Sequence, residues 1–285
     1  YTALRSILSS DVPTCHGFTR VIDVIAPPGT IMNPLHPGPT GARGITGYRM
    51  IDCLMGAFAE AVPDRVIADT AGGSTLPTIS GYENGKAFVF VETFMGNWGG
   101  TSDHDGQEGI AHLGANQSNV QVEMMESEYP IRIDRYGYVP DTGGPGEFRG
   151  GLSLTREYRV LAEEASLNLR SDKRRYPPHG LFGGHCGAPT TSILRSPAGD
   201  RVLPVLLMEP EHMNRDDVFL HVQAGGGGYG EPLKRDPRRV LWDVVEEKVS
   251  IAHAAEAYGV VIVDGKPPSV DKKATEDLRR SMGPG

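Results

Sequence analysis

The chain has 285 residues, of which 39% are hydrophobic and 22% are charged, a balance typical of a folded globular protein rather than a disordered one. Its formal net charge of -8 argues against a nucleic-acid partner, which selects for a basic face. The 37 glycines and 22 prolines predict a fold rich in turns and loops.

The sequence also contains no membrane signal and only a few cysteines. No run of about 18 apolar residues is present, so we expect no membrane-spanning helix. Cys15, Cys53 and Cys186 are isolated and lack C-x-x-C spacing, which favours reduced thiols and a cytoplasmic location.

The first predicted elements occupy residues 1 to 100. Residues 19–26 favour β-structure and predict a strand that ends at the following Pro-Pro-Gly turn. Over residues 51–62, apolar side chains recur at helical spacing until a proline ends the stripe, which predicts the longest helix of the chain. Residues 87–94 predict a strand that leads into the glycine-rich loop 96–100.

The middle of the chain is predicted to be mostly β. Residues 131–139 alternate, as do residues 152–160, and the two runs are separated by a glycine-rich loop. Further strand-like runs cover residues 165–170, 201–208 and 217–223. Such alternation is typical of strands with one buried face.

The end of the chain is predicted to be helical. Residues 237–246 have helical spacing, and Ser250 can cap a second helix that Gly259 closes before a short strand. Residues 264–285 are rich in Pro, Lys and Asp and predict a peripheral tail. We therefore expect a mixed α/β fold of the α+β kind, rich in β, with one long helix near the N-terminal third and a helical C-terminal segment.

The densest polar cluster surrounds an Asp-Gly pair at residues 105–106. Two imidazoles and two carboxylates near a glycine-rich loop can bind a divalent metal or supply a general base. The alternative is a turn, because Asp-Gly is a turn signal and His-x7-His is not a recognised ligand spacing. The candidate residues are Asp103, His104, Asp105, His112, Asn116 and Asn119.

Two acidic residues follow this cluster. Glu123 and Glu126 are three positions apart, so on a helix they share a face and can hold a cation or transfer a proton. The alternative is a solvated helical face.

The glycine-rich stretches lack the residues of a nucleotide site. Gly225–Gly230 has no Lys-Ser/Thr of a P-loop, so it predicts a tight turn, with close approach of a substrate or another subunit as the alternative. Arg149, between glycines 143–146 and 150–151, can fix an anion or hold a loop through an ion pair. We expect no nucleotide site in this chain.

Several of these segments, in this order, resemble the hydantoinase B/oxoprolinase family. The match runs from about residue 12 to residue 261 and resembles the C-terminal half of the family's B-type subunit. The combination of TGGPGxxRGG with GGGGYGxP is specific to that family. The main segments are RMIDCLMGAFAEAVPDRV (49–66), NQSNVQVEMMESEYP (116–130), RYGYVPDTGGPGEFRGGLSLTREYR (135–159), HGLFGGHCGAP (179–189) and GGGGYGEPLKRDPRRVLWDV (225–244).

The resemblance implies a B-type, hydrolytic subunit of an ATP-dependent cyclic amide hydrolase. In that family an A-type subunit uses ATP and Mg²⁺ to phosphorylate the amide oxygen of a hydantoin, lactam or 5-oxoproline, and the B part hydrolyses the activated intermediate. The implied partners are that A-type subunit, in a hetero-oligomer, and a small cyclic amide. The related acetone- and acetophenone-type ketone carboxylases are the first alternative, and a non-catalytic scaffold module is the second.

The resemblance also bears on the extent of the chain and on its cofactors. We expect residues 1–263 to be the C-terminal region of a larger subunit. Because the sequence begins with Tyr1, we expect a fragment, a processed product or a naturally split subunit. The family's divalent metal has its ligands mainly in the N-terminal half of the B-type subunit, so we expect the metal ligands to lie outside this chain.

The site residues carry over by position within the family's motifs. Asp105, Asn116, Glu123, Glu126 and Arg149 coincide with its DG, N-x-x-N, E-x-x-E and RGG segments. We expect Asp105, Glu123 and Glu126 to be catalytic. The residues expected to contact substrate or the partner subunit are Asn116, Arg149 and His104.

Overall fold

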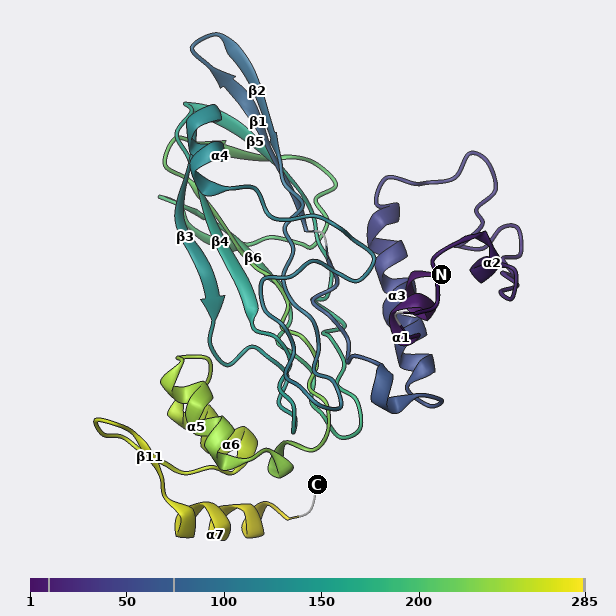
Figure 1. The fold of residues 1–285 in the computed structure, drawn as a ribbon. Coiled ribbons are helices and arrows are strands. Elements are labelled where there is room, and N and C mark those ends of the chain that lie inside the picture. The colour runs from purple at the N-terminus through teal and green to yellow at the C-terminus, as the bar shows by residue number, and fades with distance from the viewer. Residues whose placement is uncertain (10, 74, 284–285) are drawn as a thin grey trace.

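Two antiparallel sheets form the middle of the computed structural model, which describes residues 1–9, 11–73 and 75–283 (Figure 1). The first has the strand order β2-β1-β5-β8 and the second has the order β3-β4-β9-β6-β7. The strands of the first sheet are β1 (Leu76–Glu83), β2 (Lys86–Val91), β5 (Glu164–Arg170) and β8 (Glu211–Asn214). Those of the second are β3 (Ile131–Val139), β4 (Ser153–Val160), β6 (Thr191–Ser196), β7 (Gly199–Val202) and β9 (Val218–Val222).

The main core lies between these sheets. Alternate side chains of β5 point inward, so that Leu167 packs with Ile79 of β1 and with Tyr158 and Phe219 of the opposite sheet. The rings of Tyr158 and Phe219 are stacked with centroids 5.7 Å apart. Burial of one face by the other sheet therefore accounts for the alternation in the sequence.

The structure confirms most of the predicted strands. Those expected at 131–139, 152–160, 165–170 and 217–223 are present, with ends shifted by one residue at most. The strand expected at 201–208 is wrong beyond Val202. One reason is that Pro204 has no N–H to donate to a ladder.

The strand expected at 87–94 is shorter than predicted. It is β2, which begins at Lys86 and ends at Val91, and only Phe94 pairs further along, through an isolated bridge to Thr75.

The N-terminal region forms a separate small core beside the sheets. Its elements are α1 (Thr2–Ile7), α2 (His16–Thr19), α3 (Arg43–Phe58) and the 3-10 helix η1 (Pro63–Arg65). Met55 and Ala59 pack against Ala3 and Ile7, which confirms the predicted helical stripe in part. The long helix near the N-terminal third is therefore confirmed as α3.

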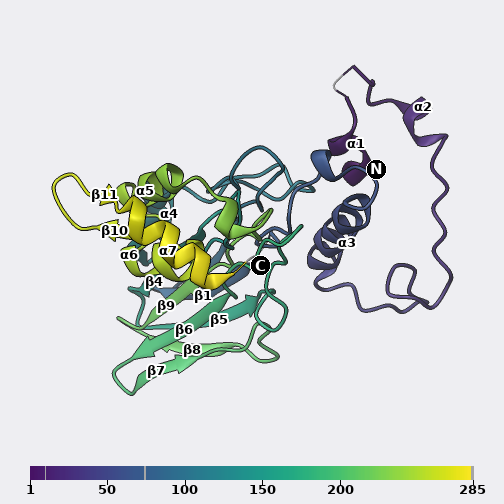
Figure 2. The ribbon, with the colours of Figure 1, turned by 90° about the horizontal axis from the view of Figure 1, so that it is seen from below.

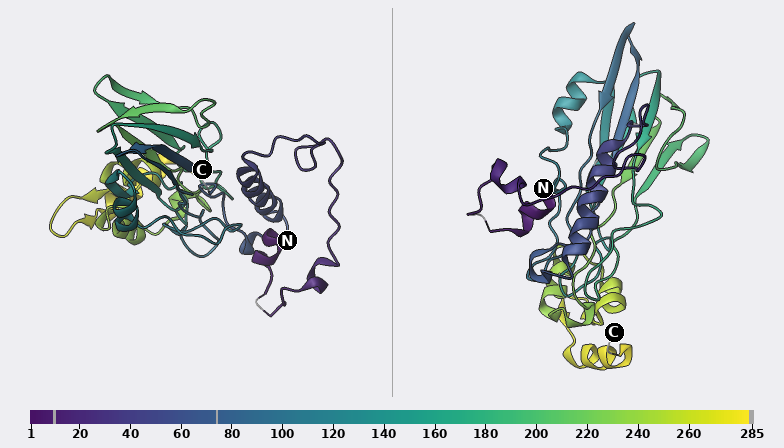
Figure 3. Two further views of the ribbon diagram at one scale, coloured as in Figure 1. Left: turned by 90° about the horizontal axis from the view of Figure 1, so that it is seen from above. Right: turned by 90° about the vertical axis from the view of Figure 1, so that its right-hand side faces the viewer.

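The strand predicted at residues 19–26 is wrong. After α2, these residues have no regular secondary structure. The apolar side chains of Val21, Val24 and Ile25 are exposed, so no described strand or core partner covers them. The chain here runs outward before it returns to α3 (Figures 2 and 3).

The predicted C-terminal helices are confirmed. Ser250 Oγ accepts a hydrogen bond of 3.1 Å from the N–H of His253, and Gly259 ends the helix with φ +61°. The elements are η2 (Pro232–Lys234), α5 (Pro237–Val245), α6 (Ile251–Tyr258), β10 (Ile262–Val263), β11 (Ser269–Val270) and α7 (Lys272–Met282).

The predicted tail contains β11 and α7, while its residues 284 and 285 lie outside the described residues. Arg279 of α7 donates hydrogen bonds to the carbonyls of Tyr258, at 3.0 Å, and Arg235, at 2.7 Å. These bonds join α7 to the rest of the C-terminal helices. A domain boundary at residue 263 stays a prediction.

Four glycine-rich segments cross at one end of the sandwich. We call residues 96–100, 143–151, 180–187 and 225–230 the glycine core. Their backbones bond to one another directly, as in Gly226 N to Gly151 O at 2.8 Å, Gly228 N to His185 O at 2.9 Å and Gly100 N to Gly227 O at 2.9 Å.

The glycines of this core are required by close approach of the backbones. A Cβ on Gly226 would lie 2.3 Å from the Trp98 carbonyl oxygen, and one on Gly150 would lie 2.0 Å from that of Gly226. The tight turn predicted for Gly225–Gly230 is wrong, because residues 225–228 have no turn and Tyr229 forms bridges to Phe148 and Leu181.

Among the described residues, no helix has both the length and the apolar character needed to cross a bilayer.

Candidate functional site

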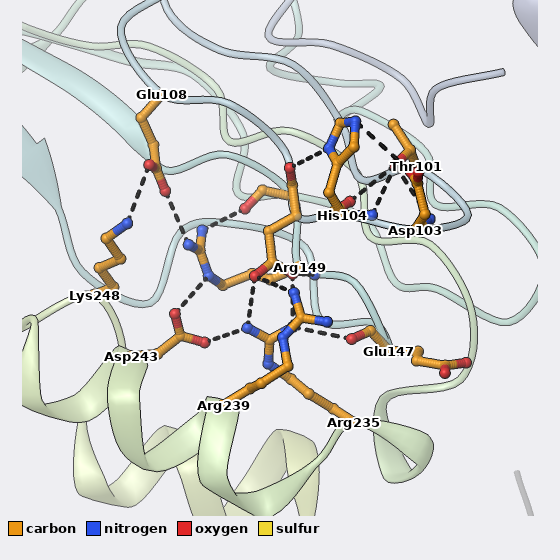
Figure 4. A network of polar contacts seen from close by, with 12 residues as sticks. Thr101, Asp103, His104, Glu108, Glu147, Arg149, Arg235, Arg239, Asp243 and Lys248 are labelled. Carbon is orange, nitrogen blue, oxygen red and sulfur yellow. Dashed lines mark hydrogen bonds and ion pairs between the residues drawn. The ribbon is translucent and has the colours of Figure 1, made fainter. Parts of the chain in front are cut away.

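The structure places two of the predicted site residues in a network of buried charges. Asp105 pairs with Arg235, which also pairs with Asp243 of α5. Arg149 of the glycine core lies beside Glu108 and Asp243, as Figure 4 shows. The guanidinium of Arg235 is 2.6 Å from Asp105 Oδ1 and 2.6 Å from Asp243 Oδ2. Arg149 NH2 is 2.9 Å from Glu108 Oε1. We call these five residues the Arg149 network.

Three carboxylates and two guanidiniums face one another in this network, and Arg239 and Lys248 add two cations at its edge. Burial raises the pKa of Asp105, but the hydrogen bonds and charge of Arg235, with the charges of Arg149 and Arg239, outweigh it and lower that pKa to about 2. Arg149 and Arg235 are almost fully buried, so their partners hold them as ion pairs inside the protein. An anion held so firmly is a weak base at neutral pH. Geometry therefore favours a structural role for the network, and a catalytic role for Asp105 stays a prediction.

His104 lies beside this network but points outward. It is exposed, and its Nδ1 is 2.9 Å from the backbone oxygen of Asp105. The Thr101 N–H donates to the His104 carbonyl at 3.0 Å, and residues 102–104 form a bend, while Asp105 and Gly106 form no turn.

The two predicted glutamates lie at the other end of the sandwich. Glu123 and Glu126 are exposed on α4 (Val122–Glu128), far from α5 in Figure 1. Glu126 Oε1 accepts a hydrogen bond of 2.7 Å from the N–H of Ile133, which ties α4 to β3. The structure does not bring these glutamates together with Asp105, and their catalytic role stays a prediction.

Asn116 lies at a wide cavity of about 600 Å³. The side chain is exposed, and Trp98, His112 and Tyr136 line the same cavity. Asn116 can therefore reach a ligand in this cavity, and its role in substrate binding stays a prediction.

A second cavity contains a group of charged residues that the sequence did not single out. It has a volume of about 330 Å³ and lies between α3 and the glycine core. We call it the Asp69 cavity. Its lining residues are Arg49, Asp52, Cys53, Gly56, Ile67, Asp69, Lys173, His179 and Leu181.

Asp69 is held from two sides in this cavity. Its Oδ2 accepts a hydrogen bond from Lys173 Nζ and another, of 3.2 Å, from the N–H of His179. Its backbone is bonded to the glycine core and to the residue before one of its segments, because the Asp69 carbonyl accepts from Gly227 at 2.8 Å and the Asp69 N–H donates to the His179 carbonyl at 3.1 Å. The glycine core thus fixes where this carboxyl sits.

A second carboxyl, that of Asp52 on α3, faces the same cluster. Asp52 Oδ2 is 2.7 Å from Arg49 NH1, and Asp52 Oδ1 is 3.2 Å from His112 Nε2. Arg49 also lies 3.7 Å from Asp69 Oδ1 and 3.0 Å from Asp172 Oδ2. Arg49 therefore lies between three carboxylates.

The pKa values of the two carboxyls move in opposite directions. Burial and the charge of Asp52 raise the pKa of Asp69, and Lys173 opposes only part of this effect. Burial also raises the pKa of Asp52, but the hydrogen bond from His112 and the charge of Arg49 outweigh it and lower that pKa. A carboxyl with a raised pKa beside one with a lowered pKa is typical of sites that transfer protons.

The backbone at Lys173 supports the same interpretation. Lys173 is buried and has φ +60°, in the left-handed region that non-glycine residues seldom adopt. Such conformations concentrate at functional sites, where the surrounding structure holds them.

The sequence offered only weak signals for this cavity. Asp69 stands shortly before the Gly72-Gly73 pair, and Lys173 belongs to a charged run after a predicted strand. The two residues are 104 positions apart, so only the folded chain brings them together.

The residues of the structure do not fit a metal centre. Within residues 1–9, 11–73 and 75–283, no three His, Cys, Asp or Glu side chains converge so that they would hold a metal ion. In the Asp69 cavity each carboxyl faces a cation instead. No step of a reaction is therefore assigned to a metal held by the described residues.

Comparison with known proteins gives one consistent group of relatives. A model of the hydantoinase B/oxoprolinase family matches residues 1–232. The B-type subunit of a putative D-/L-hydantoinase from Pseudomonas sp. (strain NS671) is 33% identical over 286 residues, which cover 98% of this chain and 48% of that protein. This chain spans about half the length of the curated relatives it matches.

Two solved structures share the fold. The crystal structure of ATP-dependent caprolactamase from Pseudomonas jessenii superposes with a TM-score of 0.85 at 26% identity, over 98% of this chain and 50% of that one. Nucleotide-free acetone carboxylase superposes with a TM-score of 0.68 at 19% identity, over 79% of this chain and 35% of that one. At 19% identity the second likeness concerns the fold alone.

Proposed function

The chain belongs to the hydantoinase B/oxoprolinase family, and we propose that it is the B-type, hydrolytic part of an ATP-dependent cyclic amide hydrolase. One observation carries the proposal: the chain is similar over 98% of its length both to a protein named as a hydantoinase subunit and to a structure named as an ATP-dependent caprolactamase. Hydantoins and caprolactam are both cyclic amides.

The proposal includes the partners and cofactors of such an assembly. An A-type subunit would bind ATP and Mg²⁺ and phosphorylate the amide oxygen, in a hetero-oligomer that works in the cytoplasm. Any divalent metal of the B part would take its ligands from outside the described residues, because these residues lack a fitting set.

The chemistry of ring opening explains why the Asp69 cavity suits this role. An amide carbonyl is a poor electrophile, and phosphorylation of its oxygen makes the carbon open to attack by water. The attacking water must lose a proton, and the ring nitrogen must gain one when the C–N bond breaks. The acyl phosphate that remains then reacts with a second water, which releases inorganic phosphate and leaves the carboxylate. A carboxyl whose pKa is raised by burial and by a second carboxylate can do both. We assign this proton transfer to Asp69, with Lys173 and Arg49 as cations that can face the phosphoryl group.

The experiment is an assay of the intact B-type subunit with its A-type partner on hydantoins, lactams and 5-oxoproline. We expect ring opening that consumes ATP. Asp69→Asn should lower kcat about 100-fold or more, since general acid–base groups contribute about 10²–10⁴-fold. Asp64→Asn, at an exposed position in η1, is the matched control and should leave kcat unchanged.

The same assay tests the residues assigned by position in the family motifs. Asp105→Asn and Glu126→Gln, made separately, should lower turnover if these carboxylates act in catalysis. Unchanged turnover with intact assembly would make them structural. If Asp69→Asn is also without effect, the chain is a scaffold module.

The ketone carboxylases are the competing function. The observation that supports this second candidate is the fold that the chain shares with acetone carboxylase. Fixation of bicarbonate that depends on a ketone, with no ATP consumption on any cyclic amide, would replace the hydrolase proposal with a carboxylase.

A further inference from the structure

An apolar surface lies uncovered on the outer side of α3 and on the chain before it. We call residues 20–35 the strap. Along it, Val21, Ile25, Ile31 and Leu35 are 84%, 87%, 79% and 67% exposed. In Figures 2 and 3 the strap stands away from the sheets. Four such residues on one short segment are too many for an ordinary exposed loop.

The strap and α3 enclose an apolar groove. Its volume is about 590 Å³, and Ile31, Met32, Ile45, Met50 and Leu54 supply its apolar lining. Leu54 belongs to the helical stripe predicted from the sequence, yet it is 42% exposed while the neighbouring Met55 is buried. The packing against α1 therefore covers only part of the apolar stripe of α3 and leaves Leu54 exposed.

The lengths of the relatives point to the occupant. The chain matches 48% of the hydantoinase subunit and 50% of the caprolactamase chain, so in each of them a comparable length of polypeptide lies outside the match. We propose that the strap and the groove receive this remaining half of the B-type subunit. The inference rests on membership of the family and not on which cyclic amide is hydrolysed.

This docking would also place the Asp69 cavity at the boundary between the two halves. Arg49 and Cys53 line both the groove and the Asp69 cavity. Asp172 lines the groove and lies 3.0 Å from Arg49. A polypeptide seated in the groove would therefore contact side chains that also face Asp69, and would complete a wall of that cavity.

The exposed thiol of Cys53 provides the test, because it reports on the groove without any need for turnover. The sample is the intact subunit, as one polypeptide or as two that carry both halves, and the reference is the chain of residues 1–285. N-ethylmaleimide labelling is followed peptide by peptide. We expect Cys53 to react at least about tenfold more slowly in the intact subunit than in the reference chain.

Two variants at equally exposed positions give the matched control. Ile25 in the strap and Met208 on a distant loop are both 87% exposed, so neither substitution disturbs the core. Ile25→Glu should restore fast labelling of Cys53 in the intact subunit, because it introduces a charge into an apolar contact. Met208→Glu should leave Cys53 protected.

Three results would overturn the proposal. The first is equally fast labelling of Cys53 in the intact subunit and in the reference chain. The second is labelling of Cys53 that is equally slow in the Ile25→Glu and Met208→Glu variants of the intact subunit. The third is protection that is lost on dilution of the intact single-chain subunit, which would mean that a second copy covers the groove. A lack of catalytic activity would affect none of these readouts, so failure of the proposed function is distinguishable.

Discussion

Asp105 and Asp69 are both partly buried carboxyls near the glycine core, but their surroundings give them opposite properties. Asp105 faces arginines that keep it ionised, whereas burial, together with the charge of Asp52, makes ionisation of Asp69 harder. The sequence pointed to Asp105 because it stands in a dense polar cluster. It did not point to Asp69, because the partners of Asp69 come from distant segments and leave no local pattern.

At the residue scale, we predict that Asp105→Asn lowers stability at neutral pH by about 2 kcal/mol. The pKa of Asp105 falls from 3.8 to about 2 on folding, and each unit is worth about 1.4 kcal/mol. A lowered pKa adds stability that is fully present above pH 3.8 and is lost as the pH falls to about 2. Urea unfolding at several pH values should therefore show that the free energies of unfolding of wild type and variant approach each other as the pH falls from 3.8 to about 2.

The control for this prediction is Asp103→Asn. Asp103 is two positions away but its side chain is 81% exposed, so its removal should change stability by less than about 0.5 kcal/mol. A loss equal to that of Asp105→Asn would contradict the explanation through the buried arginines.

At the scale of single elements, alternation predicted strands well where a second sheet covers one face. The strand at 165–170 illustrates this, because its alternation follows the burial of every second side chain, whereas most side chains of the strand at 131–139 stay exposed. The segment 19–26 has similar residues but no partner among the described residues, and it forms no strand. An alternating sequence pattern therefore predicts a strand correctly only where another part of the fold packs against the apolar face.

A buried histidine of β9 gives a prediction about pH. Burial lowers the pKa of His221 to about 4. The hydrogen bond between His221 and Gln223, which spans 2.8 Å, raises the pKa and offsets only part of the effect of burial. The folded protein therefore binds a proton less readily than the unfolded chain, so stability should fall by about 3 kcal/mol as the pH drops from 6.5 to 4. Chemical denaturation across this range measures it.

Two substitutions separate this histidine from the others. His221→Gln should make the free energy of unfolding depend less on pH between pH 6.5 and 4, although it will lower stability overall. His104→Gln, at an exposed position, should keep the slope of the wild type. An unchanged slope in His221→Gln would contradict the prediction.

The start of α6 gives a second prediction at this scale. Ser250→Ala removes the acceptor for the His253 N–H and should cost about 1 kcal/mol. Thermal unfolding should show a drop in Tm of a few degrees. Ser281→Ala, near the end of α7, removes a hydroxyl that caps no N–H group and should shift Tm by less than half as much.

At the scale of the whole molecule, the glycine core joins both sheets, the Asp69 cavity and the Arg149 network. We predict that Gly226→Ala destabilises the protein by more than about 4 kcal/mol or prevents folding, because its Cβ would lie 2.3 Å from the Trp98 carbonyl oxygen. Gly137→Ala in β3 meets no atom within 4 Å and should change stability by less than about 1 kcal/mol. Circular dichroism and urea unfolding of both variants compare them.

The sequence showed where these glycines are but not what they do. Glycine repeats are equally consistent with turns, ligand loops and close packing, and only the contacts between segments distinguish these. The same limit applied to the Asp69 cavity, whose residues come from α3, from a loop and from the chain after β5.

The order of the glycine segments along the chain has a consequence for folding. Gly227 accepts from Gly100 and donates to Asp69, so the position of Asp69 depends on a segment that begins 156 residues later in the sequence. Contacts between such distant segments form slowly. A ribosome must therefore release residues 225–230 before the cavity can assemble, even though all its lining residues lie before position 182. During synthesis the two sheets can begin to pair while the carboxyl of Asp69 still has no fixed place.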